Sequence, residues 1–443
     1  MIYRDKLLWK KMIVLGGDFL WLFVALFAAL FVRRGHWPEE AIWAGHFWSF
    51  LPIFLLWVAI FFIIDLYHYK ILQNLYRTLF SLFGGVLIAT FLTAIFFYIF
   101  LPITVISPKV TLILVSVVSF TILGSWRGFC YLVFFRKIWR QNVLILTNDD
   151  GADRFPFGMV KSGGIEYDIS VLPLNSFDIG QIVKEQKIDE IVVAFDYKKD
   201  YNLARDLVKI ASSGVKILEW PLFYEKIYAK IPVAEIDHFW FLHHTDEAEK
   251  KGYERFKRFL DIFLSFFLLI CFSILLPFLA LSIKSSKGPI FYRQKRVGKN
   301  GKIFTLVKLR TMKEGAEENG AQWAEENDPR TTWFGRFLRR TRLDEIPQLW
   351  NILKGEMSLV GPRPERPEFT AALAEKIPFY NHRHIVRPGL TGHAQIVHPY
   401  AASIEDSLEK VAYDLYYIKN RSLFLYCKII LRTIKSILIF QGR

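Results

Sequence analysis

Cysteine and acidic side chains are both scarce in this chain of 443 residues. Its three cysteines, Cys130, Cys271 and Cys427, all lie within apolar runs, so the sequence indicates neither a disulfide framework nor a cysteine metal site. Asp and Glu number 42 against 57 Lys and Arg, which gives a formal net charge of +15. Because the basic residues flank apolar blocks, we expect anionic membrane lipids and phosphate-bearing substrates as partners, and no nucleic acid.

A glycine-rich phosphate loop is also missing from the part of the chain that has the pattern of an α/β domain. From Asn142 onward, short apolar runs separated by helix-compatible stretches predict a parallel sheet with crossover helices. The turn at residues 147–151 holds one glycine and two acids, which would repel a pyrophosphate. We therefore expect a Rossmann-like cytoplasmic domain over residues 139–249 with a scaffolding or regulatory role. The expected strands are Val143–Leu146, Tyr167–Leu172, Ile188–Phe195 and Val215–Leu218.

Hydrophobic residues, by contrast, make up 53% of the chain and are concentrated in blocks. Several of these runs have the length of a membrane-spanning helix, roughly 20 residues, and they predict a four-helix transmembrane bundle over residues 1–138. Basic residues beside the runs place both ends of the bundle on the cytoplasmic side. Asp18 and Asp65 lie near the ends of spans, where we expect water to reach them. The runs are Met12–Val32, Phe47–Tyr67, Leu79–Leu101 and Ser107–Trp126.

A fifth apolar run, Phe259–Ile283, is interrupted by Pro277 and has basic residues on both flanks. A full membrane span would place everything after it outside the cell, whereas the basic flanks favour a cytoplasmic position for both ends. Because proline removes a backbone donor and can break a helix, we expect a re-entrant membrane helix over residues 257–284. Near the end of the chain, Lys428, Arg432 and Lys435 share one helix face, which is typical of a helix that lies in the membrane interface.

The stretch Arg339–Asn351 places two adjacent carboxylates, Asp344 and Glu345, directly after a group of basic side chains. By itself, Asp344 fits two roles: the N-cap of a helix over residues 345–353, which Gly355 would end, or a catalytic carboxylate. The neighbouring cations favour the second role. A carboxylate can attack phosphorus, a second one can hold Mg²⁺, and arginines can stabilise the transferring phosphoryl group. We therefore interpret the pair as a reaction centre.

Further cations complete a candidate phosphate pocket. Asn300-Gly301 predicts a β-hairpin whose second strand delivers Lys308 and Arg310 to one side. The proline-rich segment Gly361–Pro367 is rigid, and the polar loop 314–328 is expected near the site. The histidines His382, His384, His393 and His398 lack metal-ligand spacing and are interpreted as non-catalytic. The predicted substrate-binding residues are Lys308, Arg310, Arg339, Arg342, Arg363, Arg366 and Arg387.

The stretch from about Lys257 to Arg443 resembles the bacterial sugar transferase family, whose members are monotopic polyprenyl-phosphate hexose-1-phosphate transferases. These enzymes start exopolysaccharide, capsule or O-antigen repeat units. The apolar spans and the α/β domain look like those of the large polytopic members, which include undecaprenyl-phosphate glucose and galactose transferases. The end of the chain is similar to members of exosortase-associated exopolysaccharide clusters. The matching stretches are Lys287–Gln294, Arg296–Gly298, Lys308–Met312, Leu343–Asn351, Met357–Pro364 and Arg387–Gly392, with Pro399–Ser403 and Tyr416–Leu423 in the tail.

The resemblance implies a mostly helical catalytic domain over residues 250–443 and a ping-pong reaction. Asp344 would attack the β-phosphorus of a UDP-sugar, expel UMP and carry a phosphosugar, which undecaprenyl phosphate, docked by the re-entrant helix, would then take. Glu345 would bind Mg²⁺. Lys308, Arg310, Arg339 and Arg363 fall at the family's phosphate-handling positions. The expected location is the bacterial inner membrane, with the catalytic and α/β domains on its cytoplasmic face, and the extra domains suggest subunit contacts in a homodimer.

The chain departs from the family pattern in three places. Leu276 precedes Pro277 where serine is usual, His393 stands where leucine or tryptophan is usual, and Tyr426 stands where aspartate is common. Two other functions stay open: a membrane sensor or transporter with a nucleotide-binding α/β domain, and a non-catalytic scaffold of an export complex. The missing glycine loop counts against the first, and the Asp344-Glu345 pair counts against the second.

Overall fold

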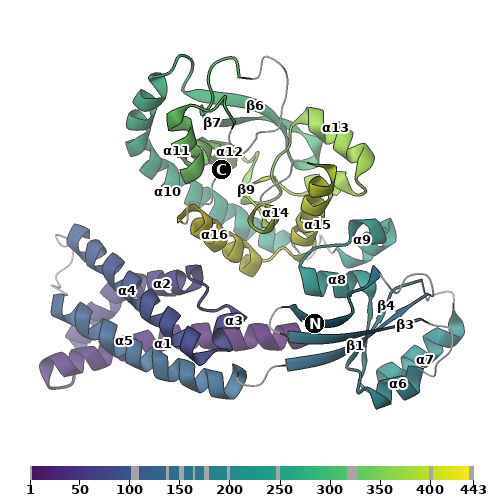
Figure 1. Ribbon diagram of the computed structural model, residues 1–443. Helices are drawn as coiled ribbons and strands as arrows, with labels where there is room; N and C mark the ends of the chain where they lie inside the picture. The colour runs from purple at the N-terminus through teal and green to yellow at the C-terminus, as the bar shows by residue number, and fades with distance from the viewer. Residues whose placement is uncertain are drawn as a thin grey trace. The chain divides into compact units, whose positions relative to one another are not determined.

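The computed structural model describes residues 2–100, 109–135, 139–148, 154–162, 165–173, 179–196, 200–245, 250–316, 328–398 and 403–438 (Figure 1). The chain divides into two compact units, Met1–Leu218 and Glu219–Arg443. Residues 149–151 of the expected acidic turn, residues 317–327 of the expected polar loop and residues 399–402 of the tail lie outside the described residues.

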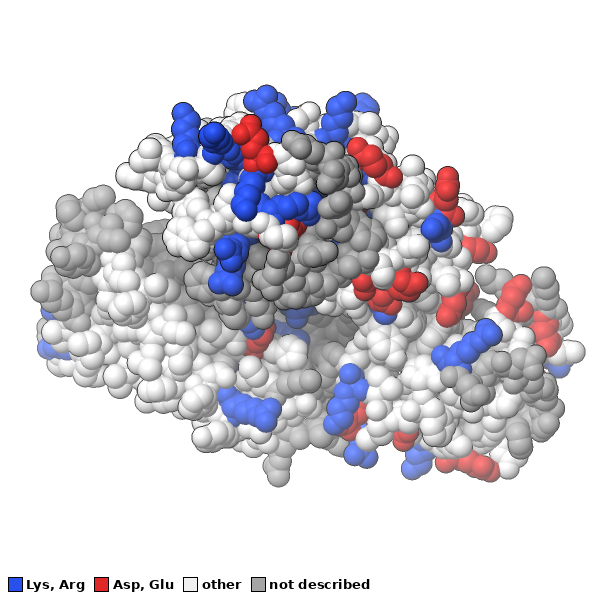
Figure 2. Space-filling model, turned by 45° about the horizontal axis from the view of Figure 1, so that its top comes forward, with Lys and Arg blue, Asp and Glu red and all other residues white. Residues whose placement is uncertain are grey.

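Long apolar helices form the first part of the N-terminal unit and confirm the four apolar runs found in the sequence. Each is long and apolar enough to cross a membrane. They bury a core rich in aromatic side chains, including Phe50, Phe54 and Trp57. In Figure 2 the described surface at the left of the view carries few charged side chains. The elements are α1 (Ile2–Arg34), α2 (Glu40–Ile63), α3 (Tyr69–Leu72), α4 (Leu75–Phe100), α5 (Lys109–Cys130) and a π-helical turn, η1 (Tyr131–Phe135).

A buried ion pair joins α1 to α5. Arg127 pairs with Asp18, and both side chains are fully buried. The Tyr67 hydroxyl donates to Oδ2 of Asp18 at 2.8 Å, and Arg127 also donates to the carbonyl of Leu66 at 3.2 Å. The expectation that water reaches Asp18 is therefore wrong. Protein groups satisfy its charge, because Arg127 lies inside the bundle instead of at its rim.

A mixed, mostly parallel sheet follows, with strand order β2-β3-β1-β4-β5. Strand β1 pairs in parallel with both β3 and β4, as the sequence predicted, and β2 adds an antiparallel edge to β3. The sequence did not predict β2, because only alternate residues of this edge strand are partly covered. The elements are β1 (Trp139–Thr147), β2 (Gly158–Ser162), β3 (Ile165–Pro173), α6 (Ile179–Glu185), β4 (Glu190–Val193), α7 (Tyr201–Ser212) and β5 (Lys216–Glu219).

The C-terminal unit begins at Glu219, earlier than the boundary at residue 250 expected from the sequence. The backbone N–H of Ile231 donates to the carbonyl of Ala412 at 3.1 Å, and Lys230 pairs with Glu409 at 2.7 Å. Residues from 231 to 241 share one hydrophobic core with the rest of this unit. The first elements of the unit are α8 (Trp220–Tyr228), η4 (Val233–Glu235) and α9 (His238–His244).

The unit continues with a long helix, α10 (Lys251–Lys284), and several of the later elements pack against one of its faces. Strands β6 and β7 form the predicted antiparallel hairpin, with Asn300 and Gly301 at φ of 55° and 75° in its turn. Strands β8 and β9 pair in parallel. The elements are β6 (Phe291–Val297), η5 (Lys299–Gly301), β7 (Ile303–Leu309), α11 (Trp333–Thr341), η6 (Leu343–Gln348), α12 (Leu349–Lys354), β8 (Ser358–Val360), α13 (Pro367–Lys376), η7 (Tyr380–Ile385), β9 (Gly389–Thr391), α14 (His393–Val397), α15 (Ile404–Asn420) and α16 (Leu423–Leu438).

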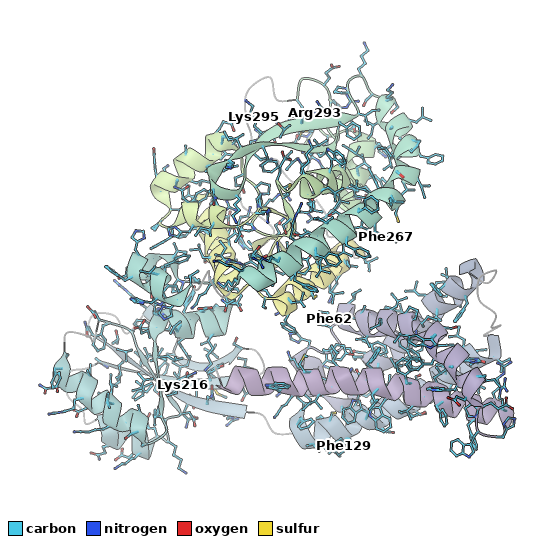
Figure 3. All side chains as sticks on the ribbon, turned by 180° about the vertical axis from the view of Figure 1, so that it is seen from behind. Phe62, Phe129, Lys216, Phe267, Arg293 and Lys295 are labelled. Atoms are coloured by element: carbon cyan, nitrogen blue, oxygen red, sulfur yellow. The ribbon has the colours of Figure 1, made fainter. Side chains whose placement is uncertain are left out.

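Helix α10 buries one face along its whole length and exposes an apolar one. Figures 1 and 3 show its ribbon changing direction before the C-terminal end, and Phe267 points outward in Figure 3. Pro277 lies inside this helix, and a proline is a recognised cause of such a kink. The buried residues are Lys257, Asp261, Ser265, Phe272 and Ile283. The exposed apolar residues include Phe259, Phe263, Phe266, Phe267, Ile274, Phe278 and Leu281.

A buried polar network holds the first half of α10. Asp261 accepts hydrogen bonds from the Ser358 hydroxyl at 2.7 Å, the Leu359 backbone N–H at 3.1 Å and the Tyr426 hydroxyl at 3.0 Å. Lys257 also donates to Ser358 and lies 3.6 Å from Asp261. Tyr426, which departs from the family pattern, therefore links α16 to α10.

We expect Asp261→Ala to lower the free energy of unfolding by about 3–5 kcal/mol, because it leaves the buried Lys257 ammonium without its carboxylate. Thermal unfolding of the detergent-solubilised protein measures this. Tyr426→Phe is the matched control: it removes one donor of the same network and is expected to cost about 1 kcal/mol. An Asp261→Ala variant as stable as the unmodified chain would show that this network does not hold α10.

Candidate active site

The two carboxylates lie on a short 3-10 helix, η6, that follows α11 directly. Arg342 separates the two elements with a left-handed backbone (φ 55°), and it is the residue at the N-cap position of η6. Asp344 is the second residue of η6, so it does not occupy the N-cap position of this helix. The capping role left open by the sequence is therefore excluded, whereas Gly355, at φ 89°, does end the following helix.

Glu345 is held by two arginines. One carboxylate oxygen accepts a hydrogen bond from Arg363 at 2.7 Å, and the other lies 3.6 Å from Arg342. Burial opposes ionisation of this side chain, but Arg363 and Arg342 outweigh burial and hold the pKa of Glu345 below its usual value. Glu345 is therefore a fixed, ionised carboxylate.

Asp344, unlike Glu345, is buried without a polar partner among the described residues. Its carboxylate makes no hydrogen bond or ion pair with any residue that the structure describes, and the side chain is 6% exposed. Burial raises the pKa of Asp344, and the negative charge of Glu345 raises it further, while Lys308, Arg339 and Arg363 oppose both. The adjacent acids thus have different environments, which is a mark of groups with different chemical roles.

Cations from β7 and α11 face this carboxylate. The half-buried Lys308 ammonium lies 5.1 Å from the centre of the Tyr292 ring and has no hydrogen-bond partner within the described ranges. Burial lowers the pKa of Lys308, and the charges of Asp344 and Glu345 raise it. Arg339 donates to the Thr311 hydroxyl at 3.0 Å. Lys308 and Arg339 therefore lie where the sequence predicted cations beside Asp344.

Arg310 holds the C-terminal end of α10. Its guanidinium is buried and donates to the carbonyls of Ile283 at 3.1 Å and Ser286 at 2.8 Å, and also to that of Lys287. It therefore caps the C-terminal end of α10, and the role of Arg310 in substrate binding stays a prediction. Gly288 has φ 114°, and a Cβ atom there would meet the Arg310 guanidinium, which explains the glycine in this stretch.

Arg366 and Arg387 contact other parts of the C-terminal unit. Arg366 is buried at the N-cap position of α13, with its guanidinium 5.9 Å from the Phe369 ring. Arg387 donates from Nε to the carbonyl of Gly355 at 3.0 Å. The role of these two residues in substrate binding stays a prediction.

The sequence did not predict a buried ion pair that contacts the backbone of Arg363. Arg383 donates to Asp414 at 2.7 Å and to the backbone carbonyl of Arg363 at 3.1 Å. It thereby positions the arginine that holds Glu345. Lys410, one helical turn before Asp414 on α15, lies near Arg363, and burial lowers its pKa. The spacing of Lys410 and Asp414 by four residues was the available sequence signal, but it is also typical of an exposed helix face.

The predicted Mg²⁺ fits the residues present. No group of three potential metal-binding side chains occurs in the part of the chain that the structure describes. Mg²⁺ bound with substrate phosphates needs only one or two carboxylates and oxygen ligands. The ionised Glu345 provides one such carboxylate, and the phosphate oxygens of a bound substrate would supply further ligands.

The four histidines do not line this pair of carboxylates. His393, another departure from the family pattern, makes a hydrogen bond to the carbonyl of Ala229 at 3.2 Å, and its ring packs on Tyr416. Burial lowers its pKa to about 4, so it is neutral at ordinary pH. It joins α14 to the segment after α8.

Comparison with known proteins matches residues 252–440, all within the C-terminal unit, to the bacterial sugar transferase family. The chain is 46% identical over 187 residues to the UDP-N-acetylgalactosamine-undecaprenyl-phosphate N-acetylgalactosaminephosphotransferase of Aeromonas hydrophila. That alignment covers 42% of this chain and 44% of the relative, so the chain spans less than half the length of this relative.

Two relatives act on glucose by name. A UDP-glucose:undecaprenyl-phosphate glucose-1-phosphate transferase of Caulobacter vibrioides is 41% identical over 185 residues, covering 41% of this chain and 69% of the relative. The Escherichia coli protein with the same description is 41% identical over 181 residues, covering 40% of this chain and 39% of the relative.

Proposed function

The chain belongs to the bacterial sugar transferase family, and from this we propose that it transfers a sugar-1-phosphate from a UDP-sugar to undecaprenyl phosphate. This is the first membrane step in making an exopolysaccharide, capsule or O-antigen. The relatives are named for different donors, N-acetylgalactosamine and glucose. We therefore propose a UDP-sugar donor without choosing between the two, in a polytopic enzyme of the exosortase-associated group.

The observation that carries this proposal is the difference between the two carboxylates. Glu345 is fixed by Arg363, whereas Asp344 has no partner among the described residues. A nucleophile has to be free to approach phosphorus, and a metal ligand has to be ionised and fixed. We assign Asp344 as the nucleophile and Glu345 as the Mg²⁺ ligand.

In the proposed reaction, an Asp344 oxygen forms a bond to the β-phosphorus while the bond from that phosphorus to the oxygen bridging to UMP breaks. UMP leaves with the electron pair. A phosphate oxygen of undecaprenyl phosphate then attacks the same phosphorus and releases the Asp344 carboxylate. Lys308, Arg339 and Arg363 stabilise negative charge on the transferring group. Mg²⁺, when bound, neutralises charge on the diphosphate.

The contacts of α10 support a re-entrant placement. Near its start, Arg258 donates to the carbonyl of Leu353 at 3.0 Å, and at its end Arg310 binds the carbonyls of Ile283 and Ser286. Because both ends contact the same compact unit, we propose that α10 enters and leaves the membrane on one face. That face is the cytoplasmic side of the inner membrane, where UDP-sugars are found.

Helix α16 supports the same placement. It exposes apolar residues, including Phe424 and Leu438, on a helix that also carries the basic residues Lys428, Arg432 and Lys435. We propose that it lies in the interface beside α10. We also propose that the enzyme forms a homodimer, since its bundle and sheet lie outside the matched region.

The function is tested by supplying the purified full chain with Mg²⁺, undecaprenyl phosphate and a panel of UDP-sugars, and measuring UMP. We expect release with one or two donors, and lipid-linked phosphosugar as the second product. Release of UMP with no member of the panel would contradict the proposal.

The pH dependence of the reaction follows from the raised pKa of Asp344. The attacking carboxyl must be ionised, so the rate falls as pH drops through this pKa, at higher pH than for an ordinary aspartic acid. Lys308 favours the ionised form, so Lys308→Met is expected to move the acid limb of kcat/KM to still higher pH. Profiles with coincident acid limbs would show that Asp344 does not titrate in this limb.

A further inference from the structure

A cavity of about 270 Å³ lies beside the first turns of α10. Its lining comes from α10, the turn of the β6–β7 hairpin, the end of η7 and the C-terminal end of α15. The apolar residues Ile385 and Val386 form part of the lining, and the rest is charged. The charged lining residues are Lys251, Glu254, Arg255, Lys299 and Arg421.

The charges of this cavity are unbalanced. Glu254 pairs with the buried Arg421 at 2.8 Å, so the one carboxylate in the lining is already neutralised. The exposed side chains of Lys251, Arg255 and Lys299 make no hydrogen bond or ion pair with any residue in the described ranges. Three cations that converge on one cavity repel one another, and a bound anion would relieve this repulsion.

The cavity is distinct from the carboxylate pair. Lys299 lies in the turn of the β6–β7 hairpin, whereas Lys308, which faces Asp344, lies at the opposite end of β7 and pairs with Tyr292. Lys308 lies five residue steps beyond Ile303 along β7, or about 17 Å. The ligand of the cavity is therefore not the phosphate that reacts at Asp344.

The surface beside the cavity indicates which kind of anion would bind there. On a helical projection, Lys251, Arg255 and Ile262 lie within about 40° of one another. Ile262 and Phe266 follow Arg255 by about 10 and 16 Å along the axis, and their side chains are 42% and 59% exposed. An anion in the cavity thus lies at the head of an exposed apolar strip of α10.

We propose that this cavity, which we name the α10 cavity, binds the phosphate of an anionic phospholipid of the bilayer. Its acyl chains lie along the strip that contains Ile262 and Phe266. The inference rests on the proposed placement of α10 at the membrane, but not on the donor or the chemistry. The bound lipid fixes the depth at which α10 enters the membrane.

The test uses the purified full chain and phosphatidylglycerol as the probe. Phosphatidylglycerol retained by the protein is counted by native mass spectrometry after exchange from nanodiscs that also contain phosphatidylcholine. Each basic residue near a lipid surface contributes about 1 kcal/mol to the binding of an anionic lipid. The Lys251→Gln/Arg255→Gln double variant is therefore expected to retain phosphatidylglycerol about 10- to 30-fold more weakly. Lys299→Gln, from a different element, is expected to weaken retention in the same direction.

The matched control is Arg293→Gln/Lys295→Gln, which removes the same charge from the outward face of β6 (Figure 3). Neither residue lines the cavity, so retention is expected to equal that of the unmodified chain. Figure 2 shows many basic side chains over the C-terminal unit at the top of the view. The control therefore distinguishes binding at the cavity from a general attraction of anionic lipid to this basic surface.

Three outcomes would overturn the proposal. Equal loss in the control and the cavity variant would show a diffuse charge effect. Displacement by inorganic phosphate alone would show a site for a soluble anion, and stronger retention of undecaprenyl phosphate than of phosphatidylglycerol would show an acceptor site. UMP release by the same preparations is recorded separately, so a failure of the proposed reaction and a failure of the lipid site give different results.

Discussion

Asp344→Asn is expected to reduce UMP release by at least about 10³-fold, because an amide cannot replace the carboxylate that forms the bond to phosphorus. The same substitution is not expected to lower the stability of the protein. The Asp344 carboxylate has no partner among the described residues and lies buried beside Glu345. Removing its charge therefore breaks no contact, and the thermal unfolding temperature is expected to stay the same or rise.

Asp414→Asn is the contrasting variant. It weakens the buried pair with Arg383, which in turn positions Arg363, so it is expected to lower stability together with activity. Unfolding curves and UMP release are measured on both variants. If Asp344→Asn lost activity only in proportion to a loss of stability, the residue would be structural and its assignment as nucleophile would fail.

Glu345→Gln is expected to reduce kcat by about 10²–10³-fold, the range seen when one group that stabilises transition-state charge is removed. It takes away the proposed metal ligand and the carboxylate that Arg363 and Arg342 hold. It also removes the negative charge that raises the pKa of Asp344. The acid limb of the pH profile is therefore expected to move to lower pH, opposite to the shift expected for Lys308→Met.

The measurement is UMP release as a function of Mg²⁺ concentration and pH. Glu345→Gln should need more Mg²⁺ for half-maximal rate, whereas Glu368→Gln, on the exposed face of α13, should behave like the unmodified enzyme. An unchanged Mg²⁺ requirement in Glu345→Gln would assign the metal to other ligands.

Features set by neighbouring residues were predictable from the sequence. Asn300-Gly301 specifies a turn by its own backbone preferences, and the apolar runs specify helices by their length. Gly355 ends α12 for a similar local reason, since only a left-handed backbone fits there. The adjacency of Asp344 and Glu345 is likewise a property of the chain itself.

Features that depend on distant partners were not predictable. The sequence shows Lys308 and Arg310 as equivalent cations, yet the first faces Asp344 and the second binds the end of α10. Arg127 and Asp18 are 109 residues apart and still share one buried site. Which cation meets which carboxylate depends on how helices pack, and no local pattern encodes it.

The helix expected over residues 345–353 shows a second limit. Pro347 and the left-handed Arg342 shorten the start of this segment into a 3-10 helix, so that α12 begins only at Leu349. A proline is compatible with the first turn of an α-helix, and the sequence alone did not show that the whole turn would differ. This difference keeps Asp344 from capping and leaves its carboxylate available.

The central claim is a covalent phosphosugar on Asp344. The most direct measurement incubates the enzyme with Mg²⁺ and an active UDP-sugar in the absence of undecaprenyl phosphate, followed by intact-mass and peptide mass spectrometry. We expect a phosphosugar adduct on the peptide that contains Asp344, release of an equal amount of UMP, and loss of the adduct when undecaprenyl phosphate is added. UMP release that requires undecaprenyl phosphate, with no adduct on the enzyme, would contradict the account.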